Sequence, residues 1–457
     1  MATYTRTTIT LIIVNILSRG LYFLNILLIN NNFTTDSNTD LLFFLLALTT
    51  NVTFYINFIS QDAILPELIR LQHKENSLDS AVQFFVQLLK IYLLISTVLI
   101  SLYSFFNTQF ISLITDFKLI TLEKNKEILL LFSPIIFFSV TTYFFGGLLS
   151  AAKKFNIVLF VGFLGNLLSI FFYWLSPEKS MLSVVLGMAI GYLIGFIGLI
   201  CYTFNKIKIR LKPQLCKSST FSQVFIKEIS SNAVLSLLNI LGYTAPYIAL
   251  TKFPDGSLSI YSFCTQISNI PVSMVIAQIA TITAVRFSNM NNTNDNVNLN
   301  KMYYKIQYKL ILGMLFIGIL INLLFPYILP LIIKGKEPKY YRTCIEYFSI
   351  ISLSLPSIAH NTIHSKLLVA KQLIFKYRLL PATYNIIFIS MIVGSSFFNS
   401  HILIYIVSIT PIVYSLFLEQ NVARRIFKLK SNKNFILLFS SYLIYFVLIQ
   451  IIHMITK

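Results

Sequence analysis

Charged residues are scarce in this 457-residue sequence. Aspartate, glutamate, lysine and arginine together make up 11% of the chain, whereas hydrophobic residues make up 56%. Soluble globular domains carry about 25% charged residues, so this composition excludes an ordinary soluble protein. The apolar residues gather in long runs separated by short polar segments, which is typical of a polytopic membrane protein. We expect an all-α membrane protein, because a helix satisfies its own backbone hydrogen bonds in lipid.

Arrangements that carry catalysis or bind metal are also missing. The sequence has 16 acidic residues and four cysteines, and the cysteines lack the spacing of a metal or redox site. His360 and His364 lie one helical turn apart, but no third ligand or HExxH motif accompanies them, so we interpret them as packing or interface histidines. The Gly146–Gly147 pair predicts close helix packing or a kink rather than a phosphate loop. We therefore predict no catalytic residue, no metal and no cofactor, and hence no enzyme.

Positive charge greatly exceeds negative charge, giving a formal net charge of +20. A basic chain can bind nucleic acid, but most of these lysines and arginines lie in short loops between apolar runs, where they set membrane orientation. Lysines and arginines are concentrated in every second loop, and these loops are expected to be cytoplasmic. This pattern places the N-terminus in the cytoplasm as well. The basic segment Lys334–Arg342 then falls outside, against the rule. We expect contacts with membrane lipids and none with nucleic acid.

About thirteen apolar runs are each about long enough to cross a membrane as a helix. Their approximate bounds are 10–30, 41–60, 84–106, 129–150, 156–176, 181–204, 229–251, 258–285, 307–333, 344–365, 379–398, 401–418 and 435–455. Because such bounds are good to a few residues, the pattern predicts about 12 to 14 transmembrane helices.

The longest strongly basic loop, residues 206–228, lies near the middle of the chain. We interpret it as a cytoplasmic linker between an N-terminal six-helix bundle, residues 1–205, and a C-terminal six-helix bundle, residues 229–420. Residues 421–457 then add one further transmembrane helix. The linker is either a solvated loop or a specific binder of anionic lipid.

A short internal repeat supports this division into two pseudo-repeats. Leu148–Ala151 ahead of Asn166 is matched 219 residues later by Leu367–Ala370 ahead of Asn385. In each copy an apolar helix ends at a basic turn and a new helix with one asparagine begins. A chance match in a chain rich in isoleucine, leucine and phenylalanine is the alternative. Two parallel repeats would place a substrate site in a central cavity, near the membrane midplane.

Arg19 lies in the middle of the first apolar run, Thr10–Asn30. An arginine near the centre of a membrane helix costs about 2.5 to 3.5 kcal/mol on insertion scales, so it is rarely without a role. Asn15 and Tyr22 lie about one turn on either side and complete a polar stripe. Arg19 is either a structural residue paired with a neighbour such as Asp40, or a cation in a water-filled cavity that binds an anion.

Neutral amides interrupt several other runs. Most such amides form interhelical hydrogen bonds worth about 0.6 kcal/mol each. Their grouping on the first two helices of each predicted bundle is informative, since they would line a polar cleft. These amides are Asn15, Asn25 and Asn30; Asn51 and Asn57; Asn232 and Asn239; and Gln266, Asn269 and Gln278.

Several motifs, in order, resemble those of the MurJ/MviN flippases, members of the MOP exporter superfamily that also holds O-antigen flippases and MATE exporters. Ser18–Leu24, SRGLYFL, is similar to the family's first-helix Ser-Arg-x-x-x-Phe-Leu-Arg pattern. Thr39–Phe43, TDLLF, is similar to its Thr-Asp-Ala-Phe-Phe opening of helix two. Further similar segments, within a likeness from about residue 10 to 420, are QDAILP at 61–66, Ser133-Pro134 followed by GGLLSAAKKF, and DGSLS at 255–259.

The resemblance implies that a lipid-linked saccharide diphosphate moves from the inner to the outer face of the cytoplasmic membrane, with cavity arginines holding the diphosphate. Arg19 corresponds to the first of these arginines, and Asp40 corresponds to the family's acidic residue. Asn25 stands where the second first-helix arginine would be, Asn57 near the helix-two glutamate, and Gln266 where helix eight carries an arginine. These departures favour a polyprenyl-linked glycan other than lipid II as the cargo.

We expect the five residues to bind substrate together. The Arg19 guanidinium would hold the diphosphate as a bidentate partner, and the amides of Asn25 and Gln266 would bind sugar hydroxyls. A straight helix puts Arg19 and Asn25 on different faces, so a bend near Ser18 and Gly20 is expected.

The sequence thus predicts a flippase for a polyprenyl-diphosphate-linked oligosaccharide. It would work by alternating access in the bacterial inner membrane, for surface polysaccharide or cell-wall assembly. The sequence does not specify whether sodium, protons or the membrane voltage drives the cycle. A MATE-type cation-coupled exporter is one alternative, but the apolar runs offer few carboxylates for a cation. A membrane enzyme of glycan polymerisation or ligation is another, disfavoured by short outer loops. A non-transporting scaffold would leave Arg19 unexplained.

Overall fold

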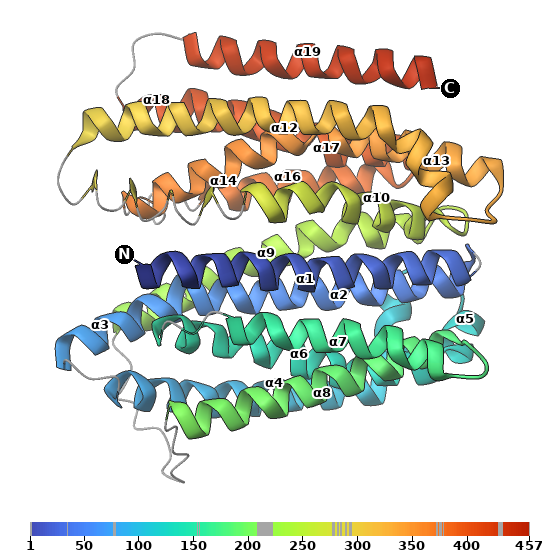
Figure 1. Ribbon diagram of the computed structural model, residues 1–457, viewed down its shortest axis with the longest axis horizontal. Helices are drawn as coiled ribbons and strands as arrows, with labels where there is room; N and C mark the ends of the chain where they lie inside the picture. Colours follow the sequence, from blue (N-terminus) through green and yellow to red (C-terminus); the bar gives the residue numbers. More distant parts are fainter. Residues whose placement is uncertain are drawn as a thin grey trace. The chain divides into compact units, whose positions relative to one another are not determined.

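A computed structural model divides the chain into two compact units, Met1–Gly256 and Ser257–Lys457. The residues that it describes are 2–33, 35–75, 79–152, 154, 156–207, 223–276, 279–280, 283, 286–287, 290–291, 295–371, 373, 377, 379–427 and 433–456. These residues form helices and turns, with no β-strand among them (Figure 1). The predicted all-α class is confirmed.

Long helices make up both units. The first unit contains α1 (Ala2–Asn32), α2 (Ser37–Ile59), the π-helical segment η1 (Ser60–Ile64), α3 (Leu65–Glu75), α4 (Asp79–Ile114), α5 (Leu119–Lys124), α6 (Lys126–Ala151), α7 (Asn156–Leu175), α8 (Met181–Lys206) and α9 (Gln223–Leu250). The second contains α10 (Ser257–Pro271), the π-helical segment η3 (Val272–Ile276), α12 (Asn296–Ile332), α13 (Pro338–Ser352), α14 (Leu355–Ala370), α16 (Leu379–Ser395), α17 (Ser400–Leu418), the π-helical segment η4 (Glu419–Ala423), α18 (Arg424–Ile426) and α19 (Lys433–Thr456).

Most of the predicted apolar runs coincide with one helix each. Among the described residues, ten helices are long and apolar enough to cross a membrane, and α16 is a shorter apolar helix. This confirms a multi-span membrane protein, while the count of thirteen stays a prediction. The run 344–365 is divided between α13 and α14, because the chain turns at Leu353 and Ser354 and Pro356 lies in the first turn of the next helix.

Glycines let α7 and α8 pack closely, and the two helices lie side by side in Figure 1. Gly187, Gly191 and Gly195 recur every four residues along α8. A Cβ at Gly191 would lie 2.5 Å from the carbonyl oxygen of Leu164, closer than real Cβ atoms approach. Such backbone contact is typical of membrane helices, whose association depends on van der Waals packing rather than on the exclusion of water.

Ser60, the first residue of η1, joins α2 to α6. Its hydroxyl donates to the carbonyl of Phe144 at 3.0 Å and accepts the N–H of Gly147 at 2.7 Å. A Cβ at Gly147 would lie 2.8 Å from the Ser60 carbonyl oxygen. Gly147 therefore serves close helix packing, as predicted. In the second unit η3 follows α10 as η1 follows α2.

The two copies of the predicted repeat end their helices with matching backbone hydrogen bonds. At the end of α6, the Leu148 carbonyl accepts the N–H four residues later at 2.9 Å, and Leu149 accepts the N–H five residues later at 2.7 Å. At the end of α14, Leu367 and Leu368 accept at the same spacings, at 3.0 and 2.9 Å. This shared helix-end geometry supports a true repeat over a chance match of letters.

The compact units and the predicted domains describe different divisions of the chain. The units divide after Gly256, and α9 packs against α2 within the first unit. The predicted bundles divide instead at the linker 206–228, of which residues 208–222 lie outside the described residues. Because packing does not test a repeat boundary, the predicted domain bounds stay a prediction.

Gly191→Ala should destabilise the first unit. Its new Cβ meets backbone atoms of α7, and overpacking of this kind costs about 1 to 3 kcal/mol. The thermal unfolding midpoint of the purified protein in detergent should fall. Gly198→Ala, on the same helix, is the control, because a Cβ there meets nothing within 4 Å. Equal midpoints for the two variants would contradict the packing described.

Candidate functional site

Arg19 lies outside the face of α1 that contacts α7. Asn25 and Ile29 are buried on that contact face, where the Ser18 hydroxyl also lies 4.0 Å from a Cβ placed on Gly162 of α7. Arg19 is one residue, about 100°, further around the helix, and its side chain is exposed. The guanidinium therefore does not take part in the contact between α1 and α7.

Two tyrosines lie near Arg19, and each interacts with one further tyrosine. Tyr22 of α1 and Tyr192 of α8 lie close enough for the guanidinium charge to act on their phenol groups. Tyr192 in turn interacts with Tyr143 of α6, and Tyr22 with Tyr247 of α9. Each tyrosine offers a hydroxyl that donates and accepts and a ring with apolar faces. We refer to Arg19 and these four tyrosines as the Arg19 cluster.

Local packing positions the two tyrosines beside Arg19. The Tyr192 ring lies against the backbone of α7, because Gly165 leaves it room: a Cβ there would lie 2.7 Å from the ring. The Tyr22 hydroxyl forms a hydrogen bond with Thr50 of α2. Thr50 donates its own hydroxyl hydrogen to the Leu46 carbonyl at 2.8 Å, so it accepts from the phenol.

Asn25 connects α1 to α7 instead of joining Arg19. Its side chain is 1% exposed. Its amide donates to Asn166 at 3.3 Å and its carbonyl oxygen accepts the Ser169 hydroxyl at 3.3 Å. Because α1 is helical without interruption from Ala2 to Asn32, the expected bend is not found and Arg19 and Asn25 stay on different faces. In this structure Asn25 has a structural role, and its contact with substrate stays a prediction.

Asp40 lies near the start of α2, away from the Arg19 cluster. Its buried carboxylate accepts the N–H of Gly256 at 2.8 Å. Gly256 has φ +90°, a conformation that favours glycine, so Asp40 holds a turn that follows α9. Thr50, which contacts Tyr22, is ten residues or about 15 Å further along α2. The structure therefore does not bring Asp40 to Arg19.

Asn57 and Gln266 have different settings. Asn57 is half-buried on α2, with its carbonyl oxygen 3.9 Å from a Cβ placed on Gly146 of α6. It follows Thr50 by seven residues, or about 10 Å, along α2. Gln266 is half-buried on α10 in the second unit. Substrate contacts of both stay predictions.

Of these four tyrosines, only Tyr22 was predicted from the sequence to belong to a polar stripe with Arg19; Tyr143, Tyr192 and Tyr247 were not predicted. The chain has 25 tyrosines, so the residue type alone carries little information. A usable signal was their position within apolar runs, where a phenol needs a polar partner.

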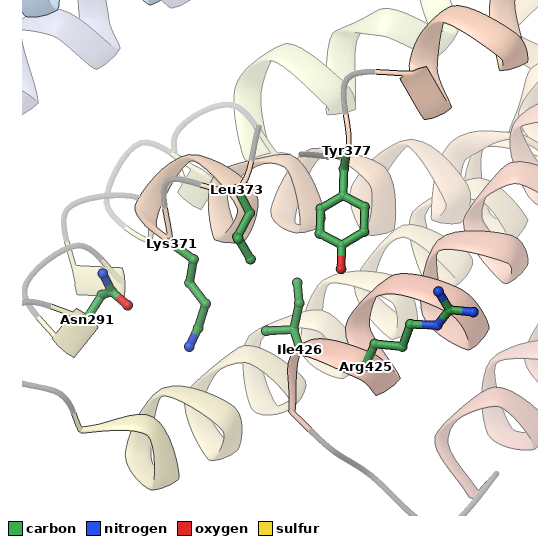
Figure 2. Close-up of a pocket in the computed structure, with 6 residues that line it drawn as sticks. All are labelled: Asn291, Lys371, Leu373, Tyr377, Arg425 and Ile426. Carbon is green, nitrogen blue, oxygen red and sulfur yellow. The ribbon is translucent and has the colours of Figure 1, made fainter. Parts of the chain in front are cut away.

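A pocket of about 450 Å³ lies in the second unit, lined in part by Lys371, Tyr377 and Arg425 (Figure 2). Figure 2 shows the Tyr377 hydroxyl directed toward Ile426 and the Arg425 guanidinium extending away from Lys371. The Lys371 ammonium donates to Asn296 at 2.6 Å, and partial burial lowers its pKa. Because the two cations diverge and one is engaged, the pocket is not built to hold one diphosphate.

Comparison with known families identifies the chain. The model of the family described as lipid II flippase MurJ matches residues 41–456. The chain belongs to the MurJ family. This confirms the resemblance based on its motifs, and with it a membrane transporter of the MOP superfamily. A search by sequence alone found no match among curated proteins.

Solved structures of MurJ and of MATE transporters share the fold. A lipid II flippase MurJ in an inward closed conformation has a TM-score of 0.74 at 18% identity, covering 98% of each chain. An inward-facing multidrug MATE transporter has a TM-score of 0.69 at 14% identity, covering 90% of this chain and 96% of that one. A MOP superfamily transporter from Pyrococcus furiosus has a TM-score of 0.62 at 12% identity, covering 93% and 96%.

Asn25 and Asn166 of this MurJ-family chain should be energetically coupled. Asn25→Ala and Asn166→Ala should each lower the free energy of unfolding, and the double variant should show a coupling of about 0.6 kcal/mol. Unfolding of the purified protein in detergent measures the cycle. Asn15→Ala combined with Asn166→Ala is the control and should be additive, since residue 15 lies ten residues, about 15 Å, from Asn25 along α1. Additivity of the Asn25 pair would contradict the contact.

Proposed function

We propose that this chain moves a polyprenyl-diphosphate-linked oligosaccharide from the inner to the outer face of the bacterial inner membrane by alternating access. Membership of the MurJ family supports a lipid-linked cargo. The observation that carries the proposal is the exposed Arg19 guanidinium on a predicted membrane-crossing helix, with tyrosines beside it.

A diphosphate needs a partner on its way through the membrane. An unpaired ion in an apolar medium costs several kcal/mol even after relaxation. A guanidinium is always charged and offers two parallel donors to phosphate oxygens. Arg19 matches this need, because it is exposed and lies off the face that binds α7.

The tyrosines of the Arg19 cluster suit the saccharide that follows the diphosphate. Phenol hydroxyls donate to and accept from sugar hydroxyls, and their rings offer apolar faces. Because Tyr22 and Tyr192 come from different helices, a headgroup at Arg19 would contact α1 and α8 together. An inside-negative potential adds about 2.3 kcal/mol per charge per 100 mV to the outward movement of the anion.

Arg19→Ala should strongly reduce flipping of the cargo in proteoliposomes. Charge-assisted hydrogen bonds are worth about 1.5 to 3 kcal/mol, so the initial rate should fall about 10- to 150-fold. Arg19→Lys keeps the charge but loses the two-donor geometry, so its rate should lie between those of Arg19→Ala and the wild type. Accessibility of a fluorescent polyprenyl-diphosphate saccharide to an external quencher measures the rate.

Arg70→Ala is the matched control. Arg70 is an exposed arginine of α3 whose Nε donates to Glu67 at 2.7 Å, outside the Arg19 cluster. Its rate should equal that of the wild type. Full flipping by Arg19→Ala would contradict the proposal, and so would export of cationic drugs without any flipping of lipid-linked saccharides. Parallel assays with lipid II and with a second polyprenyl-linked glycan distinguish a cell-wall from a polysaccharide cargo.

A further inference from the structure

The second unit contains a buried histidine–glutamate pair. His360 of α14 is 0% exposed and Glu419, the first residue of η4, is 3% exposed. The His360 Nε2 and Glu419 Oε2 atoms are 3.5 Å apart. Glutamate is almost never fully buried unless it is paired, so this position calls for a specific explanation.

The pair is only partly satisfied by its surroundings. Tyr304 of α12 donates its hydroxyl to Glu419 Oε1 at 2.8 Å. Among the described residues, Glu419 Oε2 and both ring nitrogens of His360 have no hydrogen-bond partner. Each unsatisfied buried polar atom costs about 1 to 3 kcal/mol, which a purely structural pair would avoid.

The neighbouring histidine does not supply a second positive charge. Gln307 donates to the Tyr303 hydroxyl oxygen at 2.8 Å, which leaves the Tyr303 hydrogen for His364 Nδ1 at 2.9 Å. His364 Nδ1 therefore accepts, as it does only in the neutral imidazole. The His360 and His364 rings are nearly parallel, with centroids 6.1 Å apart.

The other groups that act on Glu419 are phenols or lie beyond η4. Tyr303 and Tyr308 of α12 and Tyr442 of α19 lie within electrostatic range of the carboxylate. Arg424 begins α18 directly after η4. The described residues contain no group of three histidine, cysteine, aspartate or glutamate side chains that could hold a metal ion. The imidazole nitrogens and the carboxylate oxygens of this pair are groups that bind a proton.

We propose that His360 and Glu419 form a proton-binding site inside the second unit. Without a proton the pair carries one net negative charge in apolar surroundings. One proton from water makes it neutral, as imidazolium with carboxylate or as imidazole with carboxylic acid, and the same proton returns to water on release. The π-helical segment that begins at Glu419 adds support, since such segments concentrate at functional sites.

The proton also links transport to pH, a step that rests on the proposed flippase function. A closed site retains its proton because release would leave the buried charge uncompensated. Release then requires a conformation in which water reaches the pair. Loading and unloading of one proton would thereby accompany alternation between the two states.

Unfolding as a function of pH tests the site without any cargo. Under this proposal the folded pair holds one proton. The unfolded chain has lost that proton above about pH 6.5, because free histidine and glutamate titrate near about 6.5 and about 4.3. The folded state binds more protons, so the unfolding midpoint of the purified full chain should fall as pH rises from about 6.5 to about 8. Glu419→Gln should remove this part of the slope.

Two further variants complete the test. Glu346→Gln is the control, because Glu346 lies 3.9 Å from His401 in a more exposed pair of the same kind, and it should keep the wild-type slope. Tyr304→Phe removes the hydroxyl that donates to Glu419, so its pH profile should differ from that of the wild type. Identical pH profiles for the wild type and Glu419→Gln, or an unchanged profile for Tyr304→Phe, would overturn the site.

Flipping assays separate this inference from the proposed function. At equal pH on both sides, the rate should depend on pH in the wild type and in Glu346→Gln but not in Glu419→Gln. Flipping that needs Arg19 but has the same pH dependence in Glu419→Gln would overturn the proton link alone. A Glu419-dependent unfolding slope without any flipping would overturn the proposed function alone.

Discussion

The cost of placing an ion in an apolar medium is the constraint on which this structure depends. Arg19 lies on a helix apolar enough to cross a membrane, where an unpaired guanidinium would be strongly unfavourable. The fold meets this cost by packing α1 against α7 through a different face and by placing Tyr22 and Tyr192 beside the guanidinium. The Arg19 side chain is thereby left exposed, as the proposed contact with an anionic headgroup requires.

Glycines connect this arrangement to the fold. Gly165 of α7 leaves room for the Tyr192 ring. A Cβ at Gly191 of α8 would lie 2.7 Å from the Cα of Gly165. The same close approach of α7 and α8 therefore holds the helices together and brings a phenol toward Arg19. Asn25 and Asn166 add a polar contact between α7 and α1, so three helices are fixed around the cluster. The second unit has a buried polar pair of its own, His360 and Glu419. The Tyr304 hydroxyl of α12 donates to the Glu419 carboxylate.

The fold class followed from composition, because in lipid only a helix satisfies all the backbone hydrogen bonds of an isolated apolar segment. The similar helix ends at Leu148 and Leu367 could also be predicted from the sequence, since helix ends depend on local hydrogen bonds. The site was less accessible to sequence reasoning. Residue spacing along one helix correctly predicted that Arg19 and Asn25 lie on different faces. The partner of Asn25 could not be predicted in this way, because Asn166 lies 141 residues away in the chain. His360 was interpreted as a packing or interface residue because no third ligand accompanies the two histidines. Its partner Glu419 is distant in the chain and adjacent only after folding.

Direct contact between the guanidinium and a diphosphate is the measurement that best tests the account. Solid-state NMR of the ¹⁵N-arginine-labelled protein in lipid bilayers, with a polyprenyl-diphosphate saccharide bound, reports ¹⁵N–³¹P dipolar coupling at distances of a hydrogen-bonded pair. The account predicts a coupled guanidinium signal in the wild type that is absent in Arg19→Lys. The same coupled signal in both proteins, or none in the wild type with cargo bound, would contradict the role assigned to Arg19.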